Sequence, residues 1–133
     1  MATDVRSAPG SKKMLWAGWI VSAIPVLMLL FSGVGKLVRP PAVLEGFAHL
    51  GWPERLILPI AILEIACTLV YLVPRTAVLG AILITGYLGG ATATHVRLGE
   101  PFVLQVGFGM VAWLGLYLRD GRVRALIPLR SRA

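Results

Sequence analysis

The sequence predicts an all-α membrane protein in which four transmembrane helices form an antiparallel bundle, with a short interfacial helix between the first and the second. Hydrophobic residues make up 57% of the 133 residues, and the mean hydropathy of +0.81 is too high for an ordinary soluble domain. These apolar residues gather in four runs of the length that a helix needs to cross a bilayer. Basic residues collect at both ends of the chain and produce a net charge of +7. The three observations together indicate a multi-pass membrane protein.

The first expected span covers about residues 14–35. It contains no ionisable side chain, and at about 1.5 Å per residue it is long enough for the roughly 30 Å hydrocarbon core of a bilayer. Lys12 and Lys13 before it resemble the charged start of a signal peptide, but the apolar run is too long for one and no A-x-A cleavage site follows. We therefore expect a retained span, preceded by a disordered basic N-terminus at residues 1–13.

The only long connection between spans, residues 36–55, contains a proline pair followed by the segment AVLEGFAHLGW. In this segment Val43, Phe47 and Leu50 recur at helical spacing. The spacing predicts a short helix that lies in the membrane interface, with Phe47 and Trp52 at the level of the lipid headgroups.

The second, third and fourth spans are expected at about residues 56–73, 76–96 and 101–118. Pro53 precedes the second span, where a proline suits the first helical turn, and Pro74 ends it. Only a few residues separate these three spans. Such short connections make consecutive helices antiparallel neighbours.

The distribution of Lys and Arg outside the spans favours an N-in, C-in orientation. Nine of these residues then lie on the cytoplasmic side and four on the other, which agrees with the positive-inside bias and requires an even number of spans. Short basic clusters beside apolar spans indicate contact with lipid headgroups rather than with nucleic acid. We expect one membrane domain, residues 14–118, followed by a basic C-terminal tail at residues 119–133.

One carboxylate, Glu64, stands in the middle of the otherwise uncharged second span. An ionised side chain at the bilayer centre costs roughly 2.5–3.5 kcal/mol or more, so such a residue usually faces a protein interior or a wet cavity and has a partner. Helical spacing puts one polar group from each other span in the outer half, namely Lys36, His95 and Gln105. Glu64 would supply a base and His95 a group that titrates near neutrality. Lys36 would add a cation and Gln105 an amide, which is enough for proton handling or for anchoring a polar headgroup.

Each of these residues also has an ordinary structural interpretation. Lys36 could extend its stem to the membrane surface, and His95, near a helix end, could be solvated. Gln105 could join helices through a hydrogen bond, and Glu64 could be a protonated structural residue. Depth argues against a direct Lys36–Glu64 pair, because Glu64 lies roughly 12–16 Å below the outer end of its span. The pair would need a shift of the helices at Pro25 or Pro59, or a water molecule that bridges the gap.

The third span contains Gly86 and Gly90, a GxxxG pair surrounded by other small residues. Small residues let transmembrane helices approach closely, so we expect this face to pack against another helix. His95 projects nearly opposite Gly86 around the helix. The glycine contact and any site at His95 should therefore lie on different sides of the helix.

Several chemistries have no support in the sequence. The lone cysteine, Cys67, can form neither an intrachain disulfide nor a Cys-x-x-Cys redox centre. There is no nucleotide-binding or zinc-protease motif, and the isolated His49 and His95 make only a weak case for a metal. We therefore expect no metal and no evident cofactor, with a quinone or a lipid headgroup as the candidate ligand.

Four short motifs together resemble one known family. They are FSGVGKL at the end of the first span, EGFAHLGWPE before the second, ILE within the second, and GYLGGATATHVRLGEP in and after the third. Their order and spacing over about residues 14–129 resemble the DoxX-like family of small four-helix bacterial membrane proteins. The family pattern of a lysine, a glutamate and a histidine corresponds here to Lys36, Glu64 and His95. The resemblance implies the bacterial inner membrane as the location, and the namesake relatives are subunits of thiosulfate:quinone oxidoreductase.

These observations lead to one main functional expectation and two alternatives. We expect an accessory or small-ligand-binding membrane subunit linked to quinone or thiol redox chemistry, without independent catalytic activity. In it Glu64 and His95 would bind a polar headgroup or relay protons to it, and Lys36 would supply positive charge. One alternative is a small carrier or channel that uses Glu64 as a transport-coupled carboxylate, and the other is a purely structural membrane partner. The expected partners are the lipid bilayer and another membrane or redox-complex subunit, and a homo-oligomer is compatible with so small a bundle.

Overall fold

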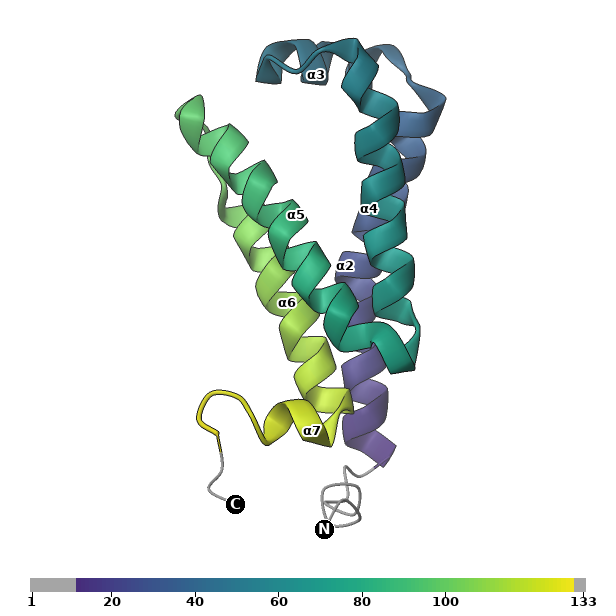
Figure 1. The fold of residues 1–133 in the computed structure, drawn as a ribbon, viewed down its shortest axis with the longest axis vertical. Coiled ribbons are helices and arrows are strands. Elements are labelled where there is room, and N and C mark those ends of the chain that lie inside the picture. The colour runs from purple at the N-terminus through teal and green to yellow at the C-terminus, as the bar shows by residue number, and fades with distance from the viewer. Residues whose placement is uncertain (1–11, 131–133) are drawn as a thin grey trace.

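The computed structural model describes residues 12–130, which form helices and contain no strand (Figure 1). The long helices are α2 (Lys12–Val38), α4 (Ile57–Leu72), α5 (Ala77–Arg97) and α6 (Val103–Arg119). The short elements are α3 (Pro41–Leu50), η1 (Glu54–Leu56), η2 (Pro74–Thr76) and α7 (Gly121–Arg124). The predicted all-helical class with several apolar helices is confirmed.

Three segments are long and apolar enough to cross a membrane, judged by length and composition. These segments are Lys12–Val38, Glu54–Leu72 and Pro74–Arg97. The fourth long helix, α6, is apolar but has only 17 residues, because Pro101 and Phe102 of the expected span lie before it.

The expected terminal segments differ in part from the structure. Lys12 and Lys13, expected in the N-terminal tail, form the start of α2, and residues 1–11 and 131–133 lie outside the described residues. The short helix α7 occupies part of the range expected to be a tail. Asp120 caps α7 by accepting a 2.9 Å hydrogen bond from the backbone N–H of Arg122.

The long helices pack in a ring. Helix α2 contacts α4 and α6, α4 contacts α5, and α5 contacts α6, while the contact between α2 and α6 is the most extensive. Glycines permit the closest approaches: a Cβ added to Gly115 would lie 2.2 Å from Ser22 Oγ, and one added to Gly80 would lie 2.2 Å from the backbone N of Tyr71. The backbones of α6 and α5 therefore touch their neighbours at these two positions, as small residues allow.

Gly86 and Gly90 do not pack against another helix within the described chain. A Cβ at either position would meet no atom within 4 Å, and both glycines line a cavity. The sequence pattern identified small residues on α5, but it did not distinguish the face that meets α4 at Gly80 from the face that lies open.

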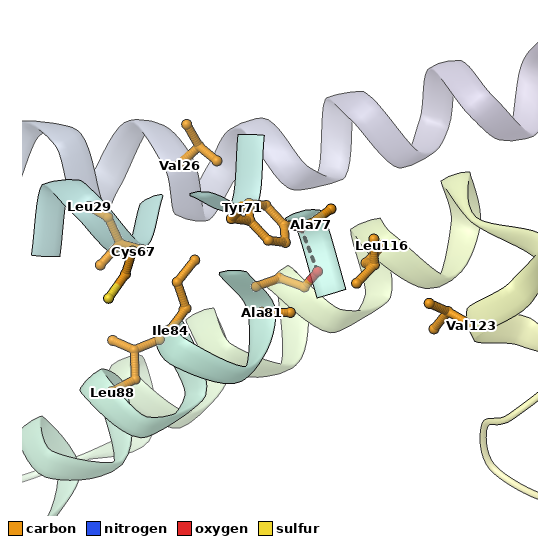
Figure 2. Close-up of a cluster of buried hydrophobic side chains, with 11 residues drawn as sticks. Val26, Leu29, Cys67, Tyr71, Ala77, Ala81, Ile84, Leu88, Leu116 and Val123 are labelled. Carbon is orange, nitrogen blue, oxygen red and sulfur yellow. Dashed lines mark hydrogen bonds between the residues drawn. The ribbon is translucent and has the colours of Figure 1, made fainter. Parts of the chain in front are cut away.

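The hydrophobic core lies toward the end of the molecule that holds α7. Figure 2 shows the core side chains contributed by α2, α4, α5, α6 and α7, among them Tyr71, which is 0% exposed. The Tyr71 hydroxyl donates a 2.6 Å hydrogen bond to the carbonyl of Ala112 and lies 3.0 Å from Ser22 Oγ. A buried phenol with hydrogen-bond partners on two other helices ties three helices together at this level.

Arg119 completes this layer. Its guanidinium lies 4.2 Å from the ring centroid of Trp19 and 4.8 Å from that of Tyr71, and its Nε donates to Ser22 Oγ at 3.2 Å. Cation–π contacts of this kind are strengthened where water is excluded. The charged residue is thus accommodated at the base of the bundle, in a layer of packed side chains from α2, α4 and α6 that we call the closed layer.

At the opposite end the helices diverge. Figure 1 shows α5 and α6 leaning away from α2 and α4, with α3 lying across the top of the molecule. This divergence positions the cavity described below.

Candidate functional site

A cavity with a volume of about 730 Å³ lies between the diverging ends of the long helices. Its walls are mostly apolar and come from α2, α3, α4, α5 and α6. The four polar residues that the sequence singles out all line it: Lys36, Glu64, His95 and Gln105. A pocket of this size and character, with a few converging polar groups, is typical of a binding site for a small molecule.

Lys36 and Glu64 form a direct ion pair. Lys36 Nζ lies 2.7 Å from Glu64 Oε2, and the same ammonium donates a 2.6 Å hydrogen bond to Ser32 Oγ. The Glu64 side chain is 2% exposed and that of Lys36 is 14% exposed. The pair therefore forms directly, although the depth of Glu64 argued against it.

Two features of the chain explain how Lys36 reaches Glu64. Helix α4 begins at Ile57, so Glu64 lies only about 10 Å into this helix. Side chains in a helix lean toward the N-terminus of that helix, and for Lys36 on α2 this is the direction of the bundle interior. Helices α2 and α4 are also very close there, as Gly33 shows: a Cβ added to this glycine would lie 2.6 Å from Ile65 Cγ1. The lysine stem spans the remaining distance.

His95 and Gln105 form a second polar group, on α5 and α6. His95 Nδ1 lies 2.8 Å from the carbonyl of Ala91. A carbonyl can only accept, so Nδ1 carries the proton, and in the neutral ring Nε2 is an acceptor. The Gln105 amide nitrogen lies 3.5 Å from each ring nitrogen, at the weak limit of a hydrogen bond.

The oxygen of the same amide is the one unsatisfied polar side-chain atom of this region. Within residues 12–130, Gln105 Oε1 is buried and has no hydrogen-bond partner. An unpaired buried acceptor costs about 1–3 kcal/mol relative to a paired one. The group on α5 and α6 therefore has unused hydrogen-bonding capacity, in contrast to the closed Lys36–Glu64 pair.

Helix α3 roofs the cavity. Phe47 and Leu50 of α3 and the following Trp52 line it, and Phe47 is buried. Two polar contacts join this roof to the far wall: His49 contacts Glu100, and the Arg97 guanidinium donates to the carbonyl of Leu50.

Both junctions of α3 have left-handed backbone conformations. Arg39 has φ of 57° before the helix, and Gly51 has φ of 77° after it. Glycine adopts this conformation without steric cost, whereas a residue with a Cβ does so rarely. The turns at the two ends set the angle at which α3 crosses the bundle.

The sequence reasoning missed Tyr87 and Phe47 as lining residues. Tyr87 lies on the cavity wall close to the Glu64 carboxylate. It precedes His95 by eight residues, about two helical turns, so helical spacing from the histidine was the signal that could have identified it. Among residues 12–130 there is no group of three or more His, Cys, Asp or Glu that could hold a metal ion.

One comparison with known proteins identifies a relationship. The model of a family described as the DoxX-like family matches residues 20–117. The matched range contains all four polar residues of the cavity and more than half of the chain. No curated protein and no solved structure matches the chain.

Proposed function

The chain belongs to the DoxX-like family, and from this premise and the cavity we propose that it is an integral membrane protein that binds a small lipophilic ligand within its helix bundle. It serves as an accessory subunit linked to quinone or thiol redox chemistry. A quinone or a lipid headgroup is the candidate ligand. All four long helices span the bacterial inner membrane, with both termini in the cytoplasm.

The exterior of the bundle supports a membrane location for all four helices. Helix α2 exposes large apolar side chains along its length, including Trp16, Ile20 and Phe31. Helix α6 exposes Leu104 and Met110, and its 17 residues extend about 25 Å, close to the thickness of a bilayer core. The basic residues near the closed end support an orientation with that end in the cytoplasm.

The observation that carries the proposal is the polar wall inside an otherwise apolar cavity. A buried ion pair such as Lys36–Glu64 is a poor means of stabilising a fold, because desolvation offsets most of the attraction. Beside it, Gln105 Oε1 has no partner among the described residues. Polar groups that do not serve stability and that line an open cavity support a role in ligand recognition.

The closed layer at Tyr71 and Arg119 favours binding over transport. A carrier or channel requires a path through the bundle, whereas this layer fills the space between α2, α4 and α6 with hydrogen-bonded side chains. The cavity ends above it. The geometry thus supports a binding site with one open side.

Native mass spectrometry after mild detergent extraction tests the proposal. The chain offers a matched pair of glycines, since Gly90 lines the cavity, Gly107 does not, and neither has an atom within 4 Å of an added Cβ. We expect the wild type and Gly107→Leu to retain a lipophilic ligand and Gly90→Leu to lose it, because leucine fills the site. Equal retention by both variants would place the ligand outside the cavity.

A further inference from the structure

The charged groups of the cavity leave no counter-ion for a charged ligand. Its described lining contains one cation and one anion, Lys36 and Glu64, and they lie 2.7 Å apart. A phosphate, carboxylate or ammonium group that entered would lose its hydration without finding an unpaired opposite charge. Such a transfer is costly, so the site favours a neutral molecule.

The polar groups near this pair bond to one another. The Lys36 ammonium donates to Ser32 Oγ and to the carboxylate. The Tyr87 hydroxyl lies beside the same carboxylate, which is the natural acceptor for its proton. Among the described residues, no buried side-chain acceptor on the α2 and α4 side of the cavity lacks a partner.

The unpaired acceptor of the cavity lies on the α5 and α6 side. His95 donates through Nδ1 to the carbonyl of Ala91, so Nε2 of the neutral ring is an acceptor, which the Gln105 amide nitrogen approaches only to 3.5 Å. Gln105 Oε1 has no partner in the described chain, and its amide is held only by the 3.5 Å contacts to the histidine. Since these contacts are weak, the amide can turn its oxygen toward the cavity when a donor is present there.

We infer that the cavity selects a neutral lipophile whose hydroxyl group donates a hydrogen bond to Gln105 Oε1. This inference rests on the proposed function and specifies the ligand class of the same site. An alcohol or a phenol pairs this acceptor, whereas the corresponding ketone or quinone presents only a further acceptor to it. The apolar walls then hold the hydrocarbon part of the molecule.

A redox pair with one carbon skeleton tests the inference. A short-chain hydroquinone carries two hydroxyl groups where its quinone carries two carbonyls, so the two probes differ mainly in hydrogen-bond donors. Binding would be measured anaerobically by isothermal titration calorimetry in phosphatidylcholine nanodiscs, which contain no competing hydroxyl groups, with empty nanodiscs as the control. We expect the hydroquinone to bind roughly tenfold or more tightly than the quinone.

A second pair distinguishes the source of the hydroxyl. A short-chain diacylglycerol has an aliphatic hydroxyl, and its acetylated derivative has none. Preference for the hydroquinone identifies a phenolic ligand, and preference for the diacylglycerol identifies a lipid alcohol. Either preference supports the inference.

Gln105→Met provides the control within the protein, because methionine keeps the length of the side chain and removes the acceptor. This variant should bind both members of the preferred pair with similar affinity, and size-exclusion chromatography would establish that it still assembles.

Three results would overturn the inference. Equal or tighter binding of the quinone and the acetylated lipid would overturn it while leaving ligand binding in the cavity intact. A preference that survives in Gln105→Met would show that other groups select the ligand. If neither pair binds the wild type, the proposed function fails together with the inference.

Discussion

Replacing Glu64 by leucine measures how strongly the bundle depends on its internal ion pair. The substitution removes the counter-ion of Lys36, whose side chain is only 14% exposed. Breaking a fully buried pair from one side costs about 3–5 kcal/mol. Because Lys36 keeps some exposure and its hydrogen bond to Ser32, we expect a smaller loss of about 1–3 kcal/mol in the free energy of unfolding.

A double-mutant cycle isolates the pair from the loss of the individual side chains. Lys36→Met alone leaves the carboxyl group of Glu64, which is 2% exposed, without its cation, and it should also destabilise the protein. The double variant with Lys36→Met and Glu64→Leu has no unpaired charge, so it should be nearly as stable as the wild type. The assay is denaturant unfolding in one mild detergent, followed by tryptophan fluorescence. Losses that simply add, with no coupling between the two sites, would refute the reasoning.

Glu64→Gln separates the role of this residue in function from its role in stability. Glutamine keeps the size of the side chain and most of its hydrogen bonding but removes the titratable proton. We expect assembly to change little and activity in a redox-stress complementation assay to fall. Full complementation by this variant would exclude proton chemistry at Glu64 and favour a structural role.

The remaining predictions concern orientation and packing. Reporter fusions should place the C-terminus in the cytoplasm and the loop containing α3 outside, and an external C-terminus would contradict the four-span arrangement. Gly115→Ala should destabilise the bundle by about 1–3 kcal/mol in detergent unfolding, because its Cβ would lie 2.2 Å from Ser22 Oγ, whereas Gly107→Ala should be near neutral. Tyr71→Phe should cost about 0.5–1.5 kcal/mol in the same assay, because it removes the hydrogen bond that the phenol donates to the carbonyl of Ala112, and an unchanged stability would argue against that hydrogen bond.

Much of the fold and the membership of the polar cavity could be predicted from helical periodicity. Hydropathy identifies apolar helices because exposing polar groups to lipid costs much free energy, and this cost can be judged for each segment of the sequence by itself. Periodicity likewise brings Glu64, His95 and Gln105 to interior faces, and the structure brings them to one cavity with Lys36. These inferences succeed because they depend on each helix by itself.

The failures arise where the answer depends on how two helices meet. The direct Lys36–Glu64 contact depends on the close approach at Gly33 and on the lean of a long side chain, neither of which a count of residues from the membrane surface includes. Similarly, Gly86 and Gly80 are equally small, yet only Gly80 faces a neighbouring backbone. Composition identifies the small residues that permit close contact between helices, but the position of the partner helix determines which of these residues form a contact.

The closed layer around Tyr71 and Arg119 gives the interior a sidedness along the membrane normal. With this layer toward the cytoplasm, the cavity lies at the depth of the outer leaflet, under the roof formed by α3. In that proposed orientation, a lipophile in the outer leaflet is at the depth of the site, whereas one in the inner leaflet is separated from it by the closed layer. Occupancy of the site would then respond to the composition of the outer half of the membrane.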